Sequence, residues 1–96
     1  MGLKFAPDVQ DFVRTLAPAP KQEIRAALRL IGEDPRHSGL NLKLLRRDGP
    51  YYFFRARVDD YRIIFAPVGD VVYVWRIQHR KDGYDWLDRL DPEDRR

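Results

Sequence analysis

Three segments rich in β-branched and aromatic residues follow one another between residues 51 and 80. They are Tyr51–Val58, Tyr61–Ala66 and Val71–Arg80, with the short turns Asp59-Asp60 and Val68-Gly69-Asp70 between them. Because connections this short join neighbouring strands only in the antiparallel direction, these segments predict a meander of three antiparallel strands. The rest of the chain must then cover one face of that sheet.

The residues before the meander follow the period of amphipathic helices instead. The apolar spacing predicts one helix of about ten residues after Pro7 and a second over Lys21–Glu33, with the proline-containing run Ala17–Pro20 between them. Gly2–Ala6 is expected to form a short edge strand, and Tyr84–Leu90 has the spacing of a short C-terminal helix.

With 96 residues, the chain is long enough for one domain with a single core, which we place at residues 1–96. We predict an α+β fold: an N-terminal helical hairpin packed on one face of a mainly antiparallel four-stranded sheet, with a short C-terminal helix. Cysteine is absent and histidine is limited to His37 and His79, so neither a disulfide nor a protein-ligated zinc or iron site is expected. No run resembles a membrane span or a leader peptide, so we expect a cytoplasmic protein without a membrane partner.

Positive charge is concentrated in the middle of the sequence. Residues 43–81 carry nine Lys or Arg against four acidic residues, which favours a polyanionic partner, although a solvated charged surface accounts for the charge equally well. Arg36–Asn41 is expected to be a polar loop. Lys43, Arg46 and Arg47 are expected to precede the sheet, either contacting RNA backbone or lying in a flexible loop.

The length of the second hairpin loop determines where Arg76 points. A two-residue Gly69-Asp70 loop would align Arg76 with Ile63 and bury a charge in the core, at a cost of several kcal/mol. A three-residue Val68-Gly69-Asp70 loop is therefore expected. It places Arg76 beside Arg62 and turns Trp75 toward the helices.

The same reasoning collects arginines on the uncovered face of the sheet, bordered by aromatic residues: Arg55, Arg57, Arg62, Arg76 and Arg80, with Tyr51, Phe53 and Tyr84. Arginine interleaved with aromatic side chains suits RNA, through phosphate contacts and base stacking. Two alternatives remain open. The arginines could pair with Asp59, Asp60 and the acidic C-terminal residues, and Tyr51 and Phe53 could serve only as cross-strand packing residues.

Residues 42–84 resemble the RelE/ParE superfamily of toxin–antitoxin toxins, specifically its RelE-like branch. The segments that carry the resemblance are Arg55-Ala-Arg57, Asp60–Phe65, and His79–Asp82 followed by Tyr84. The resemblance implies a metal-independent ribonuclease without a cofactor, which cuts mRNA in the ribosomal A site, inhibits translation and is held inactive by a cognate antitoxin. It also implies that the ribose 2′-hydroxyl attacks the adjacent phosphate and leaves a cyclic phosphate.

By position, the resemblance implies four catalytic residues. Arg62 would hold the scissile phosphate, Arg80 would stabilise developing charge, Tyr84 would stack on a base or orient the 2′-hydroxyl, and Arg55 would lie beside the attacking group. Further RNA contacts are expected from one set of side chains: Arg57, Arg76, Lys81, Tyr51, Phe53 and Lys43.

The general base is left unassigned by this comparison. Phe53 stands where the RelE toxin has a lysine, and His79, the usual type of base at neutral pH, has the parity of Ile77 and points away from the arginines. A structural role for His79 is therefore favoured. Two other functions remain open: a ParE-type inhibitor of DNA gyrase, and a catalytically weakened RNA- or antitoxin-binding module.

Overall fold

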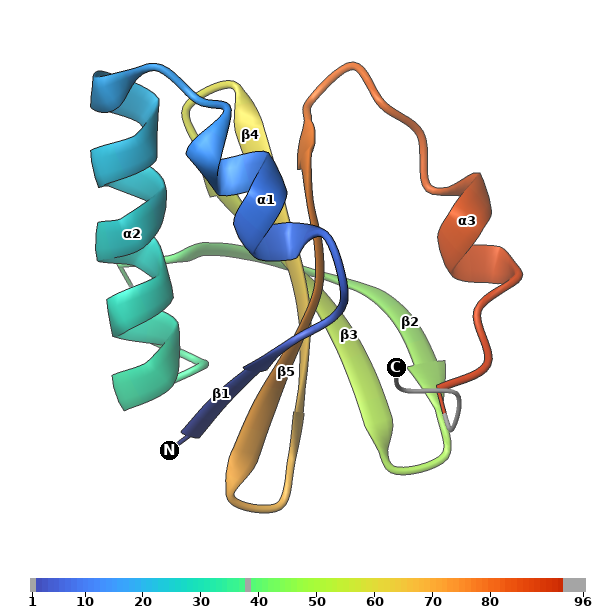
Figure 1. Cartoon of the computed structure of the whole chain (residues 1–96). Helices are drawn as coiled ribbons and strands as arrows, with labels where there is room; N and C mark the ends of the chain where they lie inside the picture. The colour runs from blue at the N-terminus through green and yellow to red at the C-terminus, as the bar shows by residue number, and fades with distance from the viewer. Residues whose placement is uncertain (1, 38, 93–96) are drawn as a thin grey trace.

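The computed structural model describes residues 2–37 and 39–92, which form a five-stranded sheet with helices on both sides (Figure 1). In chain order the elements are β1 (Gly2–Phe5), α1 (Val9–Arg14), α2 (Pro18–Glu33), β2 (Asn41–Asp48), β3 (Tyr51–Val58), β4 (Tyr61–Val68), β5 (Val71–His79) and α3 (Asp85–Asp88). The strand order is β1-β5-β4-β3-β2, antiparallel except for β1, which pairs in parallel with β5. The predicted α+β class is confirmed. No helix in the described ranges is long and apolar enough to cross a membrane.

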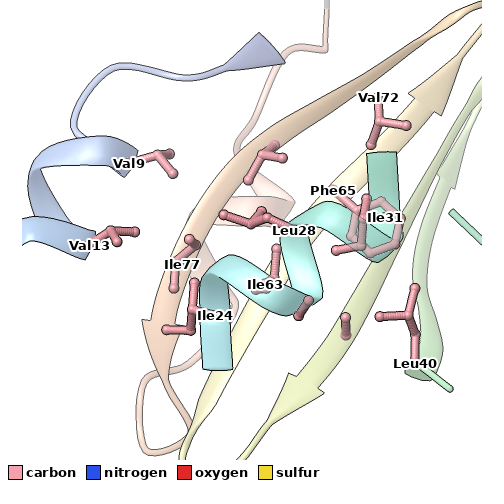
Figure 2. Packing of buried hydrophobic residues seen from close by; sticks show 13 residues of the cluster. Val9, Val13, Ile24, Leu28, Ile31, Leu40, Ile63, Phe65, Val72 and Ile77 are labelled. Carbon is pink, nitrogen blue, oxygen red and sulfur yellow. The ribbon is translucent and has the colours of Figure 1, made fainter. Parts of the chain in front are cut away.

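The helices α1 and α2 cover one side of the sheet, which we call the helix face (Figure 1). Helix α2 begins earlier than predicted, at Pro18, because a proline in the first helical turn lacks only an N–H that has no partner within the helix. Figure 2 shows its buried stripe, including Ile24 and Ile31, packed on Ile63 and Phe65 of β4. These four side chains have no exposed surface, so the sheet and α2 share one dry core.

Strand β2 is the main difference from the predicted fold. The segment from Asn41 to Asp48 forms an edge strand paired with β3, where a loop and unstructured charges were expected. A bulge between Leu44 and Arg46 interrupts the alternation of side chains, and Leu44 remains 48% exposed. An edge strand can carry charged residues because one of its edges faces water. The alternation of apolar and polar residues that marks a strand is therefore weak between Asn41 and Asp48, and the strand was not predicted.

The connection between β4 and β5 also differs from the expected one. The loop is the two-residue Gly69-Asp70, with Gly69 at φ 59°, and Val68 pairs with Val71. A bulge in β5 then shifts the register, so that Arg76 lies opposite Ile64 and stays out of the core. The three-residue loop was therefore wrong, although the reason for it, keeping Arg76 out of the core, holds.

The bulge also changes the side to which Trp75 belongs. Trp75 packs with Tyr73 and Phe53 on the side opposite α1 and α2, and not under the helices as expected. We call this side the α3 face, because Leu87 of α3 is buried against the same cluster. The register of the first hairpin is as predicted: Arg57 pairs with Arg62 across the Asp59-Asp60 turn.

Candidate functional site

The α3 face has an apolar half and a basic half. The apolar half is a buried cluster closed by the C-terminal helix: Tyr51, Phe53, Ala66, Tyr73 and Trp75, with Leu87. Phe53 has 0% and Tyr51 has 6% of its surface exposed. The expectation that these two side chains stack on RNA bases is therefore wrong for this conformation. Their aromatic surface is used to pack α3 against the sheet, and the packing alternative holds.

The basic half lies in two cross-strand rows of the register. One row is Lys43, Arg55, Ile64 and Arg76, and the next is Arg57, Arg62 and Gln78. Side chains in neighbouring rows on one face of a sheet lie within reach of each other. The sheet thus brings the expected arginines of β3, β4 and β5 together, but Arg62 has Gln78 as its neighbour on β5, where Arg76 was expected.

Arg62 and Tyr84 form the direct contact at the centre of this half. The guanidinium carbon of Arg62 lies 5.7 Å from the centroid of the Tyr84 ring, within cation–π range. The Nε–H of Arg62 is buried and, among the described residues, has no hydrogen-bond partner. Two residues separated in sequence and expected to act together are therefore neighbours.

A second arginine is stacked on the segment that carries Tyr84. The guanidinium of Arg76 lies 4.6 Å from the ring centroid of Trp86, and the Trp86 indole N–H donates to Gln78 Oε1 at 2.9 Å. Gln78 Nε2 in turn donates to the carbonyl oxygens of Asp82 and Gly83. Residues 82–86 are thus fixed over the basic half by polar contacts to β5.

Arg80 stands at the border of the site. Its backbone N–H donates to the Asp60 carbonyl oxygen, which continues the β4–β5 pairing by one position, and its Nε lies 3.4 Å from a carboxylate oxygen of Asp60. Both side chains are about half exposed. The alternative in which the arginines pair with turn carboxylates is therefore realised at Arg80. Lys81 is exposed in the following turn.

Arg46 attaches α3 to the far edge of the sheet. Its guanidinium donates to the carbonyl oxygens of Leu87 and Leu90, forms an ion pair with Asp48 at 2.6 Å, and lies over the Phe53 ring. A cation at the last carbonyls of a helix satisfies groups that the helix itself leaves unpaired. Arg46 therefore has a structural role within strand β2, and the flexible loop, one of the two alternatives for it, is wrong.

His79 has the structural environment that its parity predicts. Its ring packs edge-on against Tyr61, with 5.5 Å between centroids, and its Nδ1 accepts a hydrogen bond from the Lys81 N–H. The other histidine, His37, caps its own loop by accepting from the Gly39 N–H. In residues 2–37 and 39–92, no three His, Asp or Glu side chains are grouped closely enough to hold a metal ion.

Three residues of this region were missed by reasoning from the sequence: Gln78, Trp86 and Arg46. Gln78 has the parity of Arg76 in an otherwise apolar strand, and a lone uncharged polar residue there was the available signal. Trp86 lies in the predicted C-terminal helix, and its partners, the Arg76 guanidinium and Gln78, could not be read from the spacing. The role of Arg46 had no signal, since strand β2 itself was not recognised.

Comparison with known proteins gives a consistent set of relatives. Residues 3–84 match the family model described as the ParE toxin of the type II toxin–antitoxin system parDE. The curated protein Toxin RelE3 of Methanocaldococcus jannaschii is 34% identical over 80 residues, covering 79% of this chain and 90% of the relative.

Solved structures of RelE toxins, alone or in complex, share the fold of this chain. The archaeal RelE–RelB complex from Pyrococcus horikoshii OT3 superposes with a TM-score of 0.74 at 19% identity, over 85% of this chain and 97% of the matched chain. The isolated E. coli RelE toxin gives a TM-score of 0.63 at 19% identity, over 92% and 93% of the two chains. At this level of identity, the likeness concerns the arrangement of helices and strands.

Proposed function

The chain belongs to the RelE/ParE superfamily of type II toxin–antitoxin toxins, and from that membership we propose that it is an endoribonuclease that cleaves mRNA in the ribosomal A site. The observation that carries the proposal is the contact of Arg62 with Tyr84 on a sheet face that also presents Arg55, Arg57 and Arg76. A surface of this kind suits a phosphodiester flanked by unpaired bases.

The proposed reaction is an internal phosphoryl transfer within the RNA. The ribose 2′-oxygen forms a bond to the adjacent phosphorus, its proton leaves to a base, and the bond from phosphorus to the 5′-oxygen breaks as that oxygen gains a proton. The product strand ends in a cyclic phosphate. Negative charge grows on the phosphoryl oxygens in the transition state, so fixed guanidinium donors stabilise it more than the ground state.

Each candidate catalytic residue has a role that its surroundings support. Arg62 meets the phosphate, since within the described ranges it has no carboxylate partner, and Tyr84 beside it offers a ring to a base or a hydroxyl to the ribose. Arg55 lies in the cross-strand row next to that of Arg62, where it adds positive charge beside the phosphate and the attacking group. Arg80 is oriented by Asp60 through its Nε, which leaves its terminal amino groups available to stabilise charge.

His79 is a poor candidate for the base. Its ring is packed on Tyr61, and its Nδ1 is occupied by the Lys81 N–H. The residues that face the phosphate in this proposal are arginines, which stay protonated in proteins and so act through charge. The chain's own contribution is therefore electrostatic and positional.

We also propose a cognate antitoxin as the protein partner. The relatives solved as complexes contain RelB bound to RelE, including those from Pyrococcus horikoshii OT3 and Methanococcus jannaschii. An unneutralised basic surface attracts an acidic segment of a partner. Co-expression with the product of the neighbouring open reading frame should restore growth and yield a co-purifying complex.

A second function is favoured by one specific observation, the match to a family model described for ParE toxins. In that case the chain would inhibit DNA gyrase and would not cut RNA. A supercoiling assay with purified gyrase separates the two functions, since an mRNA endonuclease leaves supercoiling unchanged.

The deciding experiment is induction of the protein in bacteria, followed by primer extension on a translated mRNA. We expect growth arrest and new 5′ ends within codons for the natural chain. Arg62→Ala should abolish both, whereas Arg25→Ala, an exposed position on α2 far from the site, should abolish neither. Growth arrest with intact transcripts, or equal cleavage by Arg62→Ala, would contradict the proposal.

A further inference from the structure

Gln78 is a buried polar residue at the centre of the site, and the proposed chemistry gives it no role. Only 3% of its surface is exposed, and it lies on β5 directly opposite Arg62. Buried polar groups are costly unless their hydrogen bonds are made, so the partners of such a residue indicate what it does.

The side-chain amide of Gln78 makes hydrogen bonds to the segment that carries Tyr84. Its Nε2 donates to the carbonyl oxygens of Asp82 at 3.1 Å and Gly83 at 3.2 Å, and its Oε1 accepts from the Trp86 indole N–H at 2.9 Å. Two accepting partners and one donating partner fix which end of the amide is which. The Gln78 amide is therefore hydrogen-bonded to the chain on both sides of Tyr84.

This segment depends on such contacts for its position. Residues 82–84 have no regular secondary structure, and α3 contains only four residues, too few to be stable alone. The Trp86 ring that Gln78 holds also supports the Arg76 guanidinium at 4.6 Å. Loss of the Gln78 contacts would release Tyr84 from Arg62 and Trp86 from Arg76 together.

We propose that Gln78 is the positioning residue of this site: it holds Tyr84 over the Arg62 guanidinium through residues 82–86 and does not itself touch the RNA. The inference rests on the proposed function for its effect on rate. Its geometric content is independent of that function, because it concerns where the Tyr84 ring lies in the free protein.

The variants separate the two sides of the amide. Gln78→Met keeps the length and volume of the side chain but makes none of the hydrogen bonds, and Gln78→Glu keeps the acceptor for Trp86 but loses both donors. Trp86→Phe removes the indole N–H together with the five-membered ring that carries it, but retains an aromatic ring beneath Arg76. Gln22→Met, at an exposed position on α2, is the matched control.

The rate should be measured as single-turnover cleavage of mRNA on programmed ribosomes. We expect Gln78→Met and Gln78→Glu to lower the maximal rate about 10- to 100-fold, with little change in the ribosome concentration at half-maximal rate, because a small displacement of a reacting group costs rate and not binding. Trp86→Phe should lower it about 2- to 10-fold, as expected for one neutral hydrogen bond. Gln22→Met should match the natural chain.

A double-mutant cycle distinguishes positioning from general destabilisation. If Gln78 acts chiefly through Tyr84, Gln78→Met should have a much smaller effect in a Tyr84→Ala background, limited to the contribution that runs through Trp86 and Arg76. Multiplicative losses in the double variant, or a natural rate in Gln78→Met, would overturn the inference.

A measurement on the free protein separates failure of this inference from failure of the proposed function. In the chain labelled with 3-fluorotyrosine, the Tyr84 ¹⁹F resonance, assigned with Tyr84→Phe, should move toward the free amino acid value in Gln78→Met. If Gln78→Met does not fold, Gln78→Glu takes its place. An unmoved resonance in a folded variant overturns the positioning role, whereas a moved resonance beside uncut mRNA supports it and rejects the nuclease.

Discussion

The two faces of the sheet are both partly buried, but by different means. On the helix face, α2 presents aliphatic side chains such as Ile24 and Ile31 to Ile63 and Phe65, and these four side chains are fully buried (Figure 2). On the α3 face, a helix of four residues covers only the apolar half, and polar contacts from side chains on β2 and β5 hold it there.

The two faces differ in which property a substitution should change, stability or activity. Apolar packing of a whole helix stabilises the fold, and a cavity there affects every function at once. On the α3 face, the basic half gathers cations that repel each other, and residues 82–90 are held over the sheet partly by a few polar contacts, so the basic half adds little to stability. Changes on the helix face should therefore alter stability, and changes on the basic half should alter activity.

The largest effect should come from the helix face. Phe65→Ala removes a fully buried ring between α2 and the sheet and should lower the free energy of unfolding by about 3–5 kcal/mol. Urea denaturation followed by circular dichroism measures it. Leu44→Ala, at an exposed leucine on β2, serves as control and should change stability by about 0.5 kcal/mol or less. Similar losses in both variants would remove the distinction between the faces.

The converse result is expected at the centre of the basic half. Arg62→Lys keeps the positive charge but loses the planar fork, and should lower single-turnover mRNA cleavage about a hundredfold. Its free energy of unfolding should stay within about 1 kcal/mol of the natural value, because Arg62 has no ion-pair partner among the described residues. Cleavage at the natural rate would show that a point charge is sufficient there.

The attachment of α3 can be tested at Arg46, with an intermediate effect. A lysine at position 46 lacks the guanidinium group that donates to the Leu87 and Leu90 carbonyl oxygens. Arg46→Lys should therefore lower the free energy that holds residues 85–90 on the sheet by about 1.5–3 kcal/mol, the value of hydrogen bonds to a charged group. Amide hydrogen exchange in residues 85–90 should be faster to that extent. Arg47→Lys, which loses only a stack on Tyr52, should leave those amides unchanged.

The smallest effect is expected at the exposed rim of the basic half. Arg57→Gln should reduce the slope of log affinity for RNA against log salt concentration by about 1, with little loss of maximal cleavage. Filter binding at several salt concentrations measures the slope, and Arg25→Gln on α2 is the control. An unchanged slope would place Arg57 outside the RNA contact.

The sequence was sufficient to predict the class of fold, the helix stripes and the first hairpin, because these depend on local periodicity. It was not sufficient to predict bulges. Counting alternate residues along a strand assumes an unbroken register. The bulge near Trp75 shifts that register and so keeps Arg76 out of the core, and the bulge after Leu44 interrupts the alternation by which strand β2 could have been recognised. Tyr51 and Phe53 were left open between RNA contact and cross-strand packing, because the sequence did not show that α3 packs on them; they belong to a core on the α3 face.

The candidate site was predictable where the residues carry charge and not where they organise others. Arg62 and Tyr84 lie together as expected, because charged and aromatic residue types can be recognised in the sequence as members of one candidate site. Gln78 has no chemistry of its own, and its three hydrogen bonds run to backbone and indole atoms that only the folded chain places near it.

The parallel pairing of β1 with β5 has a consequence for how the molecule is made. Gly2 lies beside Val71, so β1 leaves the ribosome well before its partner strand β5 has been synthesised. Until then the core under α1 is not covered by the β1–β5 pair. Pairing these two strands closes a loop of most of the chain, which is slow. The sheet is thus complete only once β5 has been synthesised, so the full fold forms only when the arginines of β3, β4 and β5 are all present.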